Sequence, residues 1–202
     1  MHWVEVSGYQ LPRPCSDHPA LELCNTWAGW NTQRRTREYL LDYDRLAVWA
    51  GYAGLLDPDA VARLRQAAER DPAAAKRALT NLLRFRTAFY RVLVGPPDPD
   101  AFRLVAATAQ KAWSRTELAD GKGVARWRLP DSVGLDLPLF AVARSAADLL
   151  TSPDRAKVRA CPGNDCGWLF FDRGGRRRWC HMAACGNRAK VKAYADRHRT
   201  TD

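Results

Sequence analysis

Four cysteines in two close pairs constrain the fold of this chain more than any other feature. Cys161 and Cys166 form the first pair, and Cys180 and Cys185 form the second after thirteen intervening residues. Paired thiolates on tight turns supply the four soft ligands that zinc prefers in a tetrahedral site. Because four cysteines leave no coordination position open, we expect one structural Zn²⁺ rather than a catalytic one.

The sequence around the cysteines predicts how the two pairs are brought together. Residues 162–165 form a turn sequence, residues 168–171 are strand-like, and residues 177–180 can return as a second strand. A helix is expected over residues 187–199. The order of knuckle, hairpin and helix is that of a treble-clef zinc finger. Because so small a module buries little apolar surface, zinc should supply much of its folding free energy.

Three further residues are of types that bind zinc but are not expected to be ligands. His181 follows Cys180 directly and could be a ligand, but the four cysteines already complete the set. Cys15 and Cys24 stand apart, and we interpret them as ordinary core or surface thiols. The N-terminus has no signal-peptide pattern, so we expect a reducing, cytoplasmic location, which favours metal binding over disulfides.

Positive charge is concentrated in the same C-terminal quarter of the chain. Residues 151–202 hold twelve basic and five acidic residues, whereas residues 1–150 hold twenty and seventeen. This asymmetry favours a polyanionic partner such as nucleic acid, although a solvated basic tail would have the same composition. The candidate phosphate contacts are Arg173, Arg176, Arg177, Arg178, Arg188, Lys190 and Lys192.

The apolar residues of this region allow two interpretations. Val191, Tyr194 and Ala195 share one face of the expected C-terminal helix, and we expect that face to pack on the finger. The aromatic residues of the finger could stack on bases, but in so small a domain they are more typical of a core. These aromatic residues are Trp168, Phe170, Phe171 and Trp179.

The chain before the finger is predicted to be mainly helical. Aspartate–proline pairs mark two of the helix starts. Helices are expected over residues 42–56, 60–69, 73–94, 99–113 and 137–150. A strand is expected over residues 2–11, a loop over 31–38 and a hairpin over 115–129.

These elements predict an α+β fold with two domains. The N-terminal domain, residues 1–152, is mainly helical with a small sheet, and residues 153–202 form the treble-clef finger. Turn residues at 151–154 mark the boundary, because the charge and the cysteine content change there.

Two segments of the finger resemble a known family. Residues 161–170, CPGNDCGWLF, and residues 177–190, RRWCHMAACGNRAK, are similar to the CGNR zinc finger, which is named for the tetrapeptide at residues 185–188. Residues 20–27, ALELCNTW, and residues 141–150, AVARSAADLL, resemble parts of the ABATE domain that precedes this finger. The resemblance implies an N-terminal domain that binds an unidentified ligand and a finger that binds DNA, in a family described as stress-induced transcription regulators.

Three classes of function remain open on this evidence. The first is a DNA-binding transcription regulator that responds to a small molecule through its N-terminal domain, whose six tryptophans could line a pocket or form core. The second is a small enzyme with its pocket in that domain and a purely structural finger; no catalytic motif is visible, so we assign no catalytic residue. The third is an RNA- or protein-binding module.

Two further expectations concern partners. No apolar stretch is long enough to cross a bilayer, so no membrane partner is expected. A homodimer would raise affinity for DNA, but no residue marks an interface.

Overall fold

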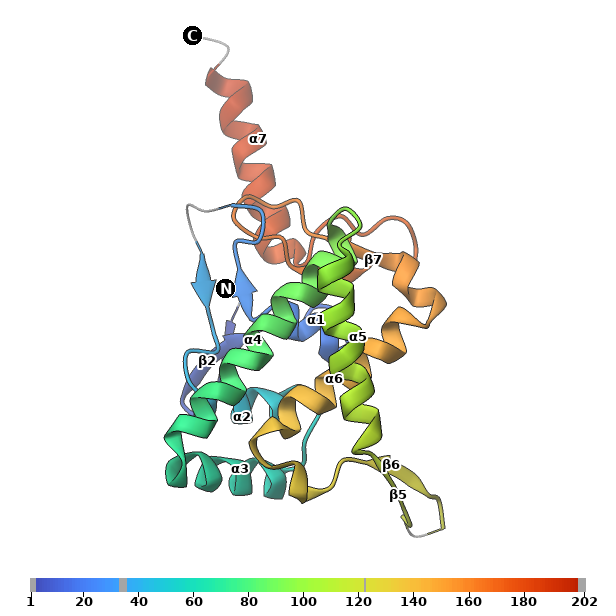
Figure 1. The fold of residues 1–202 in the computed structure, drawn as a ribbon. Coiled ribbons are helices and arrows are strands. Elements are labelled where there is room, and N and C mark those ends of the chain that lie inside the picture. Colours follow the sequence, from blue (N-terminus) through green and yellow to red (C-terminus); the bar gives the residue numbers. More distant parts are fainter. Residues whose placement is uncertain (1–2, 33–35, 122, 200–202) are drawn as a thin grey trace.

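The computed structural model describes residues 3–32, 36–121 and 123–199 and confirms the predicted α+β fold (Figure 1). Its helices are α1 (Pro19–Cys24), α2 (Tyr43–Tyr52), α3 (Pro58–Arg70), α4 (Pro72–Val94), α5 (Pro99–Ser114), α6 (Leu137–Leu150) and α7 (Asn187–Arg199). Helices α4, α5 and α6 pack on one another, α1 packs on α4 and α6, and α2 packs on α3 and α4. Among the described residues, no helix combines the length and the apolar character of a membrane span.

Aspartate side chains cap the starts of α2, α3, α4 and α5. The carboxylates of Asp57, Asp71 and Asp98 each accept a hydrogen bond from a backbone N–H in the first helical turn, and a proline follows each aspartate. The helix starts predicted from the aspartate–proline pairs are therefore confirmed, and α3 and α4 begin at the proline itself. Asp42 caps α2 in the same way. The helix predicted over residues 137–150 has those bounds.

The strands of the described residues form small two-stranded antiparallel sheets. The pairs are β1 (Trp3–Val6) with β2 (Tyr9–Pro12), β3 (Trp27–Ala28) with β4 (Arg37–Glu38), β5 (Glu117–Ala119) with β6 (Arg126–Arg128), and β7 (Val158–Ala160) with β8 (Leu169–Phe171). The hairpin predicted over residues 115–129 is confirmed by β5 and β6.

Two predictions in the N-terminal segment are wrong. Residues 2–11, of which residue 2 lies outside the described residues, form a hairpin rather than one strand. Ser7 and Gly8 both have left-handed backbone, with φ of 48° and 81°, and this geometry turns the chain back on itself. The loop expected over residues 31–38 contains strand β4, and its residues 33–35 lie outside the described residues.

The finger differs from expectation in two ways. Residues 177–180 do not form a strand, and β8 pairs instead with β7, the segment before the first cysteine pair. Helix α7 extends away from the rest of the molecule (Figure 1) and contacts mainly the π-helical turn Met182–Gly186 before it. Val191 and Tyr194 are 62% and 59% exposed, so the prediction that their face of α7 packs on the finger is wrong. Residues 177–180, the expected second strand, form no strand for this face to pack on.

One apolar core joins the helices to the finger. Phe85 and Phe89 of α4 are almost completely buried within it, and Leu169 and Phe171 of β8 belong to the same cluster. A smaller cluster surrounds the four cysteines and includes Trp168. Because β8 contributes to the core of the helical part, the two regions share apolar packing.

Candidate metal centre

The four paired cysteines converge on one point. Their Sγ atoms all lie within 4.8 Å of one another, and all four residues are buried. The Sγ of Cys180 lies 3.6 Å from that of Cys166 and 3.6 Å from that of Cys185. A regular tetrahedron with Zn–S bonds of about 2.3 Å has S···S edges of about 3.8 Å. The donor set and its spacing therefore fit one structural zinc ion, as the sequence predicted.

The first pair is held by a turn that brings backbone close to sulfur. Cys161 directly follows β7, and its N–H donates to the carbonyl of Trp168 at 2.8 Å. Asp165 has a left-handed φ of 56°, which turns the chain toward Cys166. A Cβ atom on Gly163 would lie 2.9 Å from the Sγ of Cys185, so this turn needs glycine.

The second pair is carried by the start of α7. The π-helical turn Met182–Gly186 places Cys185 just before the first residue of the helix. A Cβ atom on Gly186 would lie 2.5 Å from the Sδ of Met182, an exposed side chain that can move aside, and 3.2 Å from Cδ1 of Trp179. The Nη2 of Arg188 donates to the Sγ of Cys185 at 3.1 Å. A guanidinium beside a thiolate offsets part of the negative charge that four cysteine ligands concentrate.

The other histidine and cysteine candidates lie outside the four-cysteine cluster, His181 next to Cys180, Cys15 among the residues around the cluster and Cys24 in the main core. His181 packs edge-on against Trp168, with ring centroids 6.1 Å apart, and burial lowers the pKa of its imidazole. Cys15 and Cys24 are buried, and burial raises the pKa of both thiols well above its ordinary value. Both are buried residues outside the four-cysteine cluster, in agreement with their interpretation as ordinary core thiols.

Two asparagines fasten the finger to the N-terminal segment. The side-chain oxygen of Asn25 accepts from the N–H of Leu169 at 2.7 Å, and its Nδ2 donates to the Leu169 carbonyl at 3.0 Å. Asn31 does the same for the first turn, accepting from the N–H of Cys166 and donating to the carbonyl of Gly163. Sequence reasoning missed both residues, because each asparagine is more than 130 positions from its partner.

Aromatic residues of the helical part also contact the turn that carries Cys166. The hydroxyl of Tyr90 donates to the carbonyl of Gly167 at 2.9 Å, and its ring stacks on Trp30 with centroids 3.9 Å apart. The N–H groups of Gly29 and Trp30 both donate to the carbonyl of Cys166. The cysteine turn is thus positioned by helix α4 and by the chain around β3.

The basic residues of the finger fall into two groups. Arg177 is exposed overall, but its Nη2 donates to the carbonyls of Cys15 and Cys180 at 2.7 and 2.6 Å, and its guanidinium stacks on Phe170. Arg188 donates to the Sγ of Cys185. Within the described part of the chain, no such hydrogen bond is found for the other exposed candidates: Arg173, Arg176, Arg178, Lys190 and Lys192.

The finger aromatics are mainly core residues. Trp168, Phe170 and Phe171 are buried, and Trp179 is half-buried beneath the guanidinium of Arg178. These rings fill the space around the cysteines and between the finger and the helices. The core interpretation of the sequence is therefore the one that the structure supports.

Comparison with known families identifies both parts of the chain. The family model ABATE, described as "Putative stress-induced transcription regulator", matches residues 17–153. The CGNR zinc finger model matches residues 157–198 and covers all four cysteines. No curated protein matches the chain.

Proposed function

Because this chain belongs to the ABATE family and carries a CGNR zinc finger, we propose that it is a ligand-responsive transcription regulator that binds duplex DNA. In this proposal residues 153–202 form a treble-clef finger that contacts DNA, and residues 1–152 bind a small molecule. The order of cysteine turn, strand β8 and helix α7 supports the treble-clef assignment.

The observation that carries the DNA-binding proposal is the exposure of α7. The helix projects from the body (Figure 1), and its side chains from Lys190 to His198 are all exposed. Thirteen residues of helix span about 20 Å, and the major groove of B-DNA is wide enough, at about 12 Å, to admit a helix. A basic helix that packs mainly at its start has the shape and charge for that groove.

Two surfaces of the finger supply the phosphate contacts in this proposal. Lys190 and Lys192 lie on α7, and Arg173, Arg176 and Arg178 lie on the loop that follows β8. We give Arg177 and Arg188 a positioning role, because both already bind atoms of the metal centre. Arg177 fixes the loop that carries the other arginines, and Arg188 fixes the start of α7.

A charge-removal series tests the proposal. The variant Lys190→Ala/Lys192→Ala removes two phosphate contacts, so the slope of log K against log salt should flatten by about 1.8. The control Lys76→Ala/Arg77→Ala removes the same charge from exposed positions on α4, near the end of the body away from α7 (Figure 1), and should leave the slope unchanged. Fluorescence anisotropy with a duplex DNA probe measures both.

Two results would contradict DNA binding through α7. One is an equal slope for the α7 variant and the wild-type protein at unchanged zinc content. The other is better competition by an RNA duplex of the same sequence than by DNA, which would favour the RNA-binding alternative.

A further inference from the structure

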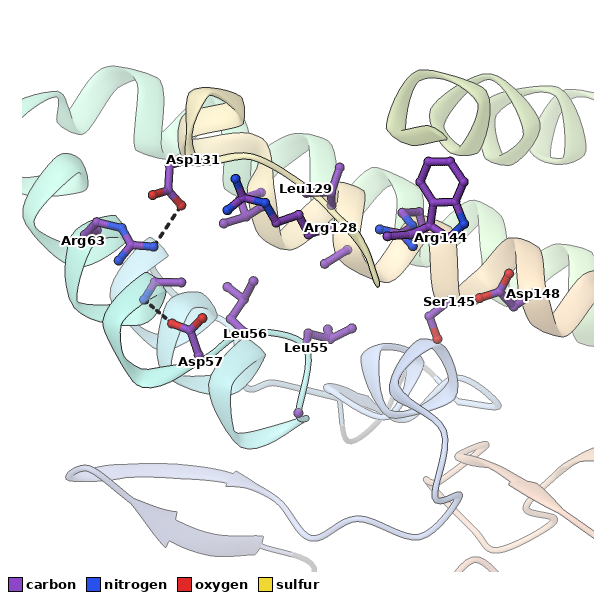
Figure 2. A pocket seen from close by; sticks show the side chains of 15 residues that line it. Leu55, Leu56, Asp57, Arg63, Arg128, Leu129, Asp131, Arg144, Ser145 and Asp148 are labelled. Atoms are coloured by element: carbon purple, nitrogen blue, oxygen red, sulfur yellow. Dashed lines mark hydrogen bonds and ion pairs between the residues drawn. The ribbon is translucent and has the colours of Figure 1, made fainter. Parts of the chain in front are cut away.

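A cavity of about 440 Å³ lies in the N-terminal part of the molecule, between the start of α3, the chain after β6, and α6 (Figure 2). Leu55, Leu56 and Leu129 give it apolar walls, and Arg144 and Ser145 line it from α6. Its size is within the range of small-molecule sites in proteins. The ABATE match covers all of these residues.

Arg144 is the unusual group in this cavity. Its guanidinium lies 4.5 Å from the ring centroid of Trp113, which in turn packs edge-on against Trp127. Burial lowers its pKa. Its Nε is shielded from solvent and has no hydrogen-bond partner among the described residues, and no described carboxylate lies within ion-pair distance of it. The charge of Asp148, one helical turn away, opposes this pKa shift without making an ion pair with Arg144, so the guanidinium keeps its capacity to bind an anion.

The other charged groups of the cavity are already engaged or less sheltered. Arg63 pairs with Asp131 at 2.9 Å, and Asp57 accepts from the N–H of Ala60 as the cap of α3 (Figure 2). Arg128 is exposed. Arg144 is therefore the group best placed to recognise an anion inside the cavity.

We propose that this cavity binds a small organic monocarboxylate, with the carboxylate on Arg144 and the apolar part against the leucines. This inference rests on the proposed ligand response and names its site and ligand class. The planar guanidinium matches the two oxygens of a carboxylate. Asp148, one helical turn beyond Arg144, lines the same wall and disfavours a dianion such as phosphate. Leu55, Leu56 and Leu129 offer an apolar contact for the hydrocarbon body, and the polar remainder of the lining leaves room for polar substituents on it.

Calorimetry with matched probes tests the site on the zinc-loaded full chain without DNA. The probes are phenylacetate and octanoate, each compared with its neutral amide. At least one acid should bind, and its amide should bind at least about tenfold more weakly, because a hydrogen bond to a charged group is worth about 1.5–3 kcal/mol. Arg144→Gln should weaken binding of that acid at least about tenfold. The control Arg63→Gln lines the same cavity and should change it less than about twofold.

A second measurement needs no variant. The indole N–H resonances of Trp113 and Trp127 should shift when the acid is added, and the same concentration of the amide should shift them much less. Equal binding of acid and amide, unchanged binding by Arg144→Gln, or no binding of either acid at about 10 mM would overturn the proposal. Because these measurements contain no DNA, their failure would not contradict the DNA-binding proposal. In the same way, a failure to bind DNA would not contradict the carboxylate site.

Discussion

At Gly163 the backbone passes so close to the zinc ligands that no side chain fits. Its missing Cβ would lie 2.9 Å from the Sγ of Cys185 and 3.4 Å from that of Cys161. Both sulfur atoms are fixed by the need to hold the metal, so neither can move away without cost. Glycine at this position is therefore required by the metal centre and not only by the turn.

Gly163→Ala should weaken zinc binding. Overpacking a tight site costs about 1–3 kcal/mol, which corresponds to a loss of affinity from about fivefold to more than a hundredfold. Competition with a chromogenic chelator measures the change. Gly174→Ala is the matched control, because a Cβ there would meet nothing within 4 Å, and its affinity should stay within about twofold of wild type. Equal zinc affinities for the two variants would show that the approach at Gly163 imposes no strain.

The cysteines could be assigned from sequence, and the residues that position them could not. Each cysteine pair is local, so the spacing of Cys161 and Cys166 carries the prediction by itself. Asn25 is polar and buried, yet its partner Leu169 becomes its neighbour only when the whole chain has folded. Arg177 was expected to bind phosphate because it belongs to a basic run, and its bond to the carbonyl of Cys15 has no local signal.

Among the elements, helices with local start signals were predicted best. Asp57 and Asp71 with the prolines that follow them fix where α3 and α4 begin, because the cap and the helical φ are properties of neighbouring residues. The strand expected over residues 177–180 failed because strand formation needs a partner. Strand β8 is already paired with β7, and Arg177 holds the later segment as a loop.

Strand β8 joins the finger to the helical part, and this predicts what zinc removal does. Cys161→Ser should lower zinc content below one ion per chain. Because α1 packs on β8 and Asn25 binds its backbone, hydrogen-exchange protection should fall in both β8 and α1. Protection in α5, which packs on α4 and α6, should change least. Exchange followed by mass spectrometry resolves these segments.

The matched control for that experiment is Cys24→Ala, which alters a buried thiol outside the metal set and should keep one zinc ion. Wild-type protection of α1 in the zinc-free variant would show that the finger and the helical part fold independently. Unchanged zinc content in Cys161→Ser would show that the ligand set is wrong.

On the scale of the whole molecule, α6 lies between the cavity and the finger. Arg144 and Asp148 face the cavity, and the same helix packs on α1 and on the 3₁₀ turn Pro153–Lys157 that leads into β7. Burial lowers the pKa of His18, the charge of Asp148 opposes that shift, and Arg173 of the finger loop adds to it. The His18 ring in turn packs edge-on against Phe171. His18 thus lies between α6 and strand β8, which precedes the basic loop.

The family resemblance predicted which two parts the chain contains, and the structure adds how closely they are joined. The bonds from Asn25 and Asn31 link residues more than 130 positions apart, and the shared core joins Phe85 and Phe89 of α4 to Leu169 and Phe171 of β8. No periodicity or motif in a single sequence carries such long-range pairing. Because the two parts form one folded unit, we expect a ligand bound to the helical part to change the affinity of the finger for DNA, and bound DNA to change the affinity for the ligand by the same factor.

The most direct test of the central claim is a selection of zinc-loaded protein against a random duplex DNA library at physiological salt. We expect that duplexes are retained, that a sequence motif is enriched, and that Lys190→Ala/Lys192→Ala recovers much less DNA than Lys76→Ala/Arg77→Ala. If the zinc-loaded chain retained no more DNA than its chelator-treated form, the finger would not be a DNA-binding module and the account would be contradicted.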